Sequence, residues 1–135
     1  MKIDIYNANI INTNHVNVHD CIFEKLEFIY SEKNIYITLS SFSSEKQSTI
    51  IVFYDVVGIN MVSCDFWGRS LHVLDWEFVD ASERWLTNKL FETKECHKYL
   101  NSTLEKPENY IETIMTLSSG DVLTIVCKYI DLQTN

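Results

Sequence analysis

The strongest structural signal in the sequence is the stretch IETIMTLSSGDVLTIVC, residues 111–127. Its two halves alternate between apolar and polar side chains, as half-buried β-strands do. A three-residue loop at 118–120 brings the apolar faces of both strands together, and Gly120 supplies the left-handed residue that such a loop needs. The stretch therefore predicts an antiparallel hairpin with the pairs Leu117–Asp121, Met115–Leu123 and Ile111–Cys127.

A second hairpin is predicted nearer the N-terminus. Residues 22–30 alternate, and their inward face is expected to carry Ile22, Leu26, Phe28 and Tyr30. A short polar turn separates them from residues 35–39, which alternate in the same way. Two alternating segments joined by a short turn indicate paired antiparallel strands.

Two more strands are expected in the middle of the chain. Residues 48–57 are apolar on both faces, which is typical of a strand in the middle of a sheet with both sides covered. Gly58 is expected to mark a bulge or bend before the next strand, 59–64. Residues 71–79 alternate again, with His72, Leu74, Trp76 and Phe78 predicted on one face and Val73, Asp75, Glu77 and Val79 on the other.

One helix is predicted at about residues 81–92. Asp80 is a suitable N-cap, Glu83 can reach back to it, and an apolar stripe follows from Ala81 through Trp85 and the pair Leu86/Leu90. The expected fold is therefore α+β, a single domain over residues 1–135. Its strands are predominantly antiparallel and form a curled sheet or small sandwich, with this one main helix.

Composition narrows the class of function. The chain has 135 residues with 11 Lys+Arg against 19 Asp+Glu, a formal net charge of −8. An excess of acid argues against a nucleic-acid surface and against an anionic membrane surface, since both need clustered Lys and Arg. The apolar run 50–61 is interrupted by Asp55 and Asn60, and no targeting segment is visible, so a cytoplasmic protein is expected. The four cysteines are widely spaced and are expected to be reduced thiols, packed as small hydrophobic side chains.

Signals for catalysis are sparse. His15 and His19 are four residues apart and Asp20 follows, so the three side chains are a candidate metal site or the centre of a small enzyme. A closed site needs more ligands than these, and the other interpretation is a turn stabilised by the Asp20 side chain. No nucleophile motif and no glycine-rich phosphate loop is present, and no cofactor is expected.

Residues 65–80 combine aromatic side chains with acidic ones. The stretch contains four carboxylates and a single arginine, Arg69, so its local charge is −3. Aromatic anchors among like charges suit an interface with a basic protein. Trp76 and Phe78 are expected in the core, whereas the predicted partner-binding residues are Asp65, Trp67, Asp75, Glu77 and Asp80.

Short motifs in the chain resemble a known kind of protein. They are His19-Asp20-Cys21, Val62–Gly68, Leu74–Glu77 and Gly120–Cys127. These stretches are similar to small, acidic, uncharacterised bacterial families, some of which are encoded in polymorphic-toxin loci. The resemblance implies an immunity-type protein that neutralises a toxin by binding it, without catalysis. Two alternatives stay open: the enzyme or metal-binding domain centred on His15, His19 and Asp20, and a structural module of a larger assembly.

Overall fold

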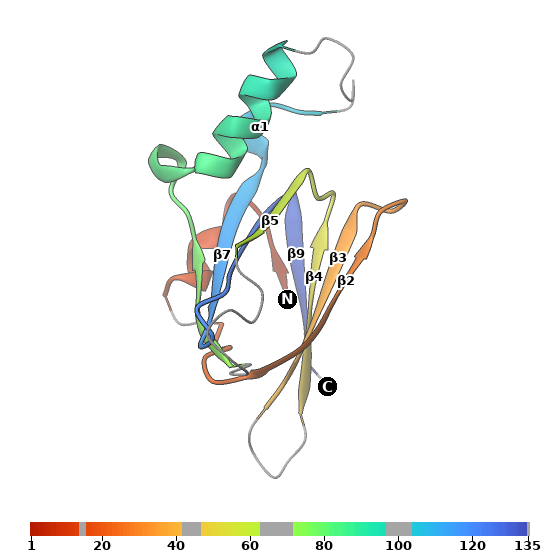
Figure 1. Ribbon diagram of the computed structural model, residues 1–135, viewed down its shortest axis with the longest axis vertical. Coiled ribbons are helices and arrows are strands. Elements are labelled where there is room, and N and C mark those ends of the chain that lie inside the picture. The colour runs from red at the N-terminus through yellow and green to blue at the C-terminus, as the bar shows by residue number, and fades with distance from the viewer. Residues whose placement is uncertain (14–15, 42–46, 63–71, 97–103, 135) are drawn as a thin grey trace.

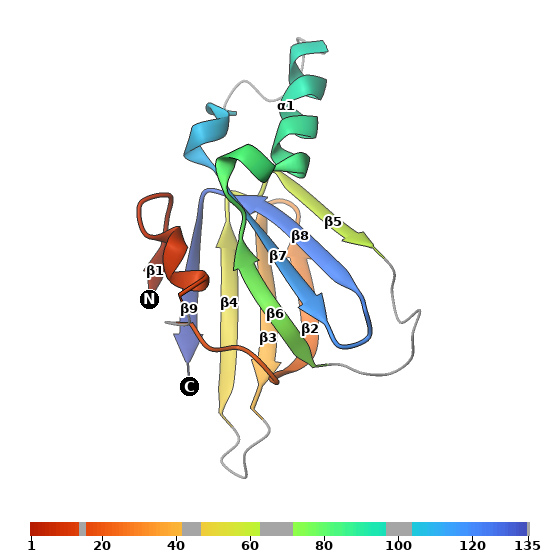
Figure 2. The same ribbon diagram turned by 90° about the vertical axis from the view of Figure 1, so that its left-hand side faces the viewer.

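The computed structural model describes residues 1–13, 16–41, 47–62, 72–96 and 104–134, and within helix α1 the side chains as far as residue 92. Two antiparallel sheets face each other, and the strands of one run obliquely across those of the other (Figures 1 and 2). Together with the one α-helix of the described residues, they confirm the predicted α+β, antiparallel class.

The first sheet has five strands in the order β1-β9-β4-β3-β2. These strands are β1 (Lys2–Ile3), β9 (Tyr129–Thr134), β4 (Ser48–Tyr54), β3 (Asn34–Ser40) and β2 (Ile22–Ile29). The second sheet has the order β5-β8-β7-β6. Its strands are β5 (Gly58–Val62), β8 (Val122–Cys127), β7 (Ile111–Leu117) and β6 (Val73–Phe78). Three 3₁₀ turns, η1 (Ala8–Ile11), η2 (Ala81–Glu83) and η3 (Pro107–Asn109), and helix α1 (Trp85–Cys96) complete the described elements.

The core lies between the two sheets. Ile35, Ile37 and Leu39 of β3 point into it and are fully buried. Side chains from β7 and β8 meet them from the other sheet. The rings of Phe53 and Trp76 make an edge-to-face contact across this space, with centroids 6.3 Å apart. Such aromatic contacts add to the stabilisation that burial of apolar area already provides.

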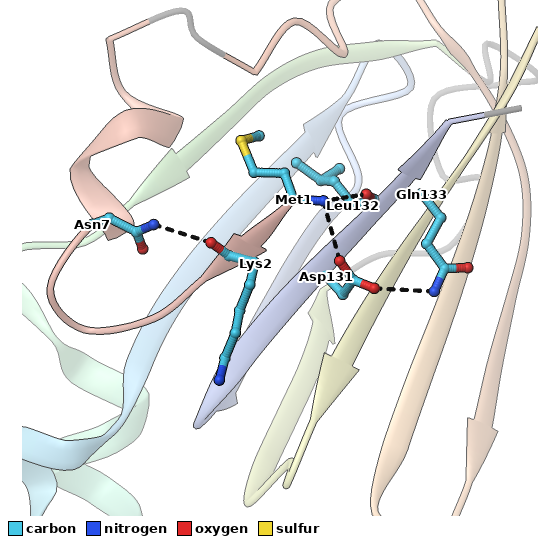
Figure 3. Close-up of polar contacts among 6 residues, drawn as sticks. All are labelled: Met1, Lys2, Asn7, Asp131, Leu132 and Gln133. Atoms are coloured by element: carbon cyan, nitrogen blue, oxygen red, sulfur yellow. Dashed lines mark hydrogen bonds and ion pairs between the residues drawn. The ribbon is translucent and has the colours of Figure 1, made fainter.

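The N-terminus is bound to the edge of the five-stranded sheet (Figure 3). The terminal ammonium of Met1 donates to the Leu132 carbonyl at 2.8 Å and to the Asp131 carboxylate at 3.3 Å. Gln133 also donates to Asp131, and this hydrogen bond, aided by the ammonium, lowers the pKa of the Asp131 carboxyl. Asn7 donates to the Lys2 carbonyl at 3.0 Å and closes the turn behind β1.

The predicted C-terminal hairpin is confirmed in register. Met115 pairs with Leu123 and Ile111 pairs with Cys127. The Leu117 N–H donates to the Asp121 carbonyl at 2.9 Å, and Gly120 has a φ of 87°. Packing of the two apolar faces and the left-handed glycine therefore select the same loop.

Strand β4 is central, as predicted, with β3 on one side and β9 on the other. Its inner face, with Ile51 and Phe53, is buried in the core. The expected second covering layer is absent among the described elements (Figure 1). Val52 on the outer face is nevertheless only 1% exposed. Its cross-strand neighbours Tyr36 and Asp131 account for this cover, because side chains directly opposite each other on one face lie in contact.

Strand β2 differs from the prediction at both ends. At its start, the bulge between Phe23 and Lys25 places Phe23, which lies opposite the buried Leu39, on the inward face in place of Ile22. The far end differs as well. Tyr30 is 73% exposed and Phe28 36% exposed, although both were expected on the inward face. Leu26 packs against the core, whereas Phe28 and Tyr30 are outside it, so the core does not reach the last residues of this edge strand.

The prediction for β6 is wrong at its start. A bulge between Val73 and Asp75 shifts the register against β7. Val73 is consequently buried and Leu74 is 45% exposed, the reverse of strict alternation. After the bulge the predicted alternation holds, with Trp76 buried and Asp75 and Glu77 exposed.

The predicted helix is displaced along the chain. Residues 81–83 form the 3₁₀ turn η2, and α1 begins at Trp85 and continues to Cys96. The Asp80 side chain makes no capping hydrogen bond, so the predicted capping box does not form. Trp85 is 43% exposed, whereas Leu86 is buried against the four-stranded sheet. No helix of the described residues has both the length and the apolar character needed to cross a membrane.

Candidate functional site

Strand β6 forms one edge of the four-stranded sheet, and the N-terminal segment is fastened to that edge at two points. At one end, the Asn12 amide donates to the Phe78 carbonyl at 3.0 Å and accepts from the Phe78 N–H at 2.8 Å. At the other end, the N–H of Asp20 donates to the Val73 carbonyl and the Val73 N–H donates to the Cys21 carbonyl. The edge of β6 is thereby held at both ends by residues far away in sequence.

A cleft of about 330 Å³ lies between these two attachment points. One wall is residues 74–77 of β6, and the other comes from residues 11–12 and 16–19. Asp75 and Glu77 are the carboxylates of the lining, and the described residues that line the cleft include no Lys or Arg. An uncompensated pair of carboxylates gives the cleft a negative potential.

The predicted partner-binding residues divide into two groups. Asp75, Glu77 and Asp80 are all exposed, and the first two share the outer face of β6. Asp75 pairs with Thr116 and Glu77 with Ile114, so β7 continues the same face beside them. Asp65 and Trp67 lie outside the described residues, and their predicted place in this patch stays a prediction.

The predicted metal site is only partly described. His19 and Asp20 form an exposed contact of 3.0 Å between Nδ1 and Oδ2. His19 lines the acidic cleft together with Asp75 and Glu77, which sequence reasoning did not foresee. His15 lies outside the described residues, and within the described part of the chain no group of three His, Cys, Asp or Glu side chains could hold a metal ion.

The turn before β2 is stabilised differently from the expectation. Asp20 has a φ of 65°, a left-handed conformation that Asp tolerates better than most residues. The side chain that accepts a backbone hydrogen bond is Asn17, from the His19 N–H at 3.2 Å.

Sequence reasoning missed two groups of residues that shape this region. The role of Asn12 could not be recognised in the sequence, because its hydrogen-bond partner Phe78 is 66 residues away. The second group is a buried polar cluster in which Glu112 accepts from the N–H and hydroxyl of Thr87, both at 2.8 Å. Arg84 lies beside it and donates to the Tyr110 carbonyl at 2.9 Å. Burial lowers the pKa of Arg84, and the negative charge of Glu112 opposes that shift.

The two cysteines whose side chains are described have the character of packed thiols. Cys127 is fully buried, and burial raises the pKa of its thiol. Cys21 is partly buried, and burial together with the charge of Asp20 raises its thiol pKa as well. A raised pKa keeps a thiol protonated and therefore a poor nucleophile.

Comparison of the chain with protein-family models, with curated proteins and with solved structures found no match to any of them.

Proposed function

We propose that this chain is a cytoplasmic, non-catalytic binding protein of immunity type, which neutralises a cognate toxin by binding it. The observation that carries the proposal is the exposed carboxylate pair Asp75 and Glu77 on edge strand β6, beside a cleft without Lys or Arg among its described lining residues. The resemblance of the short motifs to families from toxin loci supports the immunity type.

The proposed partner is a basic protein surface rather than a nucleic acid or a membrane. A net charge of −8 repels polyanions and attracts a basic partner from a distance. Complementary charge of this kind mainly raises the association rate and favours the correct orientation. Asp80 follows β6 and precedes η2, so it adds a third acidic side chain after Asp75 and Glu77. Ile114 and Thr116 of β7 lie beside Glu77 and Asp75 on the same face. A polar, charged rim next to β-branched side chains is a composition that suits a reversible interface.

The test has two steps. The first asks whether the gene beside this one encodes a toxin domain, and its absence would count against the immunity type. The second measures binding of the purified chain to that domain by association kinetics, at low and at physiological salt. The variant Asp75→Lys/Glu77→Lys should associate about tenfold more slowly or worse at low salt, because steering is lost and becomes repulsion. Both side chains are exposed, so the free energy of unfolding should change by less than about 0.5 kcal/mol per site.

The matched control is Glu32→Lys/Glu108→Lys, which makes the same change in net charge at two other exposed positions. It should slow association far less than the β6 variant. Equal slowing by both variants would show that overall charge, not the β6 patch, governs the encounter. Absence of binding by the unaltered chain would overturn the immunity proposal itself.

The metal-binding alternative has its own readout in the same preparation. Titration of the chain with Zn²⁺, compared with the variant His19→Ala, measures whether the cleft binds a metal. Stoichiometric binding that requires His19 would favour that alternative over the binding protein.

A further inference from the structure

Strand β2 is an edge strand too, and it lies at the outer end of the five-stranded sheet (Figure 1). The direction of its backbone groups follows from the neighbouring hairpin. The Ser41 N–H donates to the Gln47 carbonyl, which shows that residue 41 directs its backbone groups toward the β4 side. Every second residue of a strand points the same way, so residues 39, 37 and 35 of β3 also direct their backbone N–H and C=O groups toward β4. Residues 34, 36 and 38 therefore point toward β2.

The register between β2 and β3 then assigns each residue of the edge. Tyr36 pairs with Glu27 and Thr38 pairs with Lys25, so the backbone groups of these two β2 residues are turned inward, to β3. Leu26 and Phe28 alternate with them and direct their N–H and C=O groups away from the sheet. At the start of β2, Ile22 forms an isolated bridge with His72 on this side, whereas no strand of the described residues pairs with this side from Lys25 to Ile29.

The sequence of this edge is complementary to itself in the antiparallel direction. If Leu26 lies on a two-fold axis, it faces Leu26 of a second copy and can exchange two backbone hydrogen bonds with it. Lys25 then lies opposite Glu27 of the second copy, and Glu27 opposite its Lys25. These are non-hydrogen-bonded pairs, in which facing side chains approach most closely.

Charges on an edge strand usually prevent pairing with another chain, and a bulge between Phe23 and Lys25 also ends the regular edge on one side. The charges at 25 and 27 have opposite sign, however, so they attract a copy of the same strand. Within one chain they already form an exposed ion pair at 2.8 Å. Glu24, the remaining carboxylate, is turned back onto its own sheet and accepts from the Ser40 hydroxyl at 2.6 Å.

Apolar surface at the same edge would be buried by such pairing. Leu26 and Phe28 pair with the buried residues Ile37 and Ile35 and therefore share their inward face. Phe28 is 36% exposed in the single chain, and in the register about Leu26 it lies opposite Glu24 of the second copy. A second copy would place Leu26 against its own equivalent and continue the inner face across the axis, which removes apolar area from water.

We propose that β2 is a self-association edge, through which two copies of this chain pair antiparallel about Leu26 and form one continuous sheet. The interface is isologous, because the same strand contributes from both copies. It is one edge strand long, so the dimer is expected to be reversible and concentration-dependent.

Sedimentation velocity over a range of protein concentrations tests the proposal. The unaltered chain should shift from monomer to dimer as its concentration rises. Lys25→Glu places carboxylates opposite each other, and Glu27→Lys places ammonium groups opposite each other. Each should weaken the dimer by about tenfold or more, since two equivalent pairs change from attraction to repulsion. The double variant Lys25→Glu/Glu27→Lys should restore the dimer, because every facing pair is again opposite in charge.

The decisive measurement is a mixture of the two single variants. Lys25→Glu mixed with Glu27→Lys should form a heterodimer, which a loss of folding stability in either variant could not produce. Lys25→Glu mixed with Glu32→Lys is the control, because Glu32 carries the same charge change in the turn outside the paired stretch. A chain that stays monomeric at every concentration would overturn the proposal, and so would single variants that dimerise as well as the parent.

Discussion

Gly58 is the residue at which β5 meets helix α1. A Cβ atom added there would overlap the Leu90 side chain and would touch Leu86 at 3.6 Å. A bulge or bend was expected at this position. Gly58 is instead the first residue of β5, and its lack of a side chain leaves room for the helix. The requirement comes from a helix that lies about 30 residues further along, so local turn chemistry could not reveal it.

We expect Gly58→Ala to lower the free energy of unfolding by about 1 kcal/mol. Overpacking costs about 1–3 kcal/mol, and the reduced entropy of the unfolded chain offsets about 0.4–1 kcal/mol of that. Denaturant unfolding measures the change. In a Leu90→Ala background the added methyl has space, so the same substitution should be neutral or stabilising there. An unchanged cost in that background would contradict the packing explanation.

Helix α1 begins where a buried strand residue holds its first turn. The Glu112 carboxylate accepts from the N–H of Thr87, the third residue of the helix, as an N-cap side chain would. Its negative charge also lies at the positive end of the helix dipole. A cap supplied by β7 explains why the helix starts at Trp85 rather than at Ala81.

We expect Glu112→Ala to destabilise the fold by about 2–4 kcal/mol, since it leaves both buried donors of Thr87, the N–H and the hydroxyl, without their acceptor, at about 1–3 kcal/mol each. Thr87→Val removes only the hydroxyl hydrogen bond and should cost about 1 kcal/mol. Denaturant unfolding of both variants gives the comparison. Equal costs would mean that the carboxylate does not hold the start of the helix.

The elements that sequence reasoning predicted well are those whose determinants are local. The hairpin of β7 and β8 is specified by its own alternation and by Gly120, and its register is as predicted. The start of β6 was not predictable in this way, because its bulge depends on pairing with β7 and on attachment of Val73 to residues 20–21. The end of β2 was missed because alternation says which face a residue occupies but not how far the core extends.

The same distinction applies to the candidate site. Exposure of Asp75 and Glu77 followed from alternation with Trp76, and it is as predicted. The cleft beside them did not, because Asn12 and His19 reach β6 from a distant part of the sequence. Sequence reasoning treated the histidine cluster and the acidic patch as competing sites, yet His19 lines one cleft with both carboxylates.

The molecule as a whole is held together by a core to which both sheets contribute. Phe53 comes from the centre of the five-stranded sheet and Trp76 from the edge of the other, and they meet in that core. The chain also crosses between the sheets twice over short distances, from β4 to β5 and from β8 to β9. Elements that share one core are expected to unfold together, which is the physical content of the single-domain prediction for residues 1–135.

Amide hydrogen exchange with the variant Phe53→Ala tests that prediction. Truncation of a buried phenylalanine costs about 3–5 kcal/mol. In one cooperative unit, this loss should lower the protection of β3 and β4 and of β7 and β8 by the same free energy. Tyr54→Ala is the matched control on the outer face, where Tyr54 stacks on Tyr129 at 4.6 Å and is only half-buried, so it should cost less while still affecting both sheets equally. If protection fell only in β3 and β4, the two sheets would be separate folding units. They would then unfold independently despite the contact between Phe53 and Trp76.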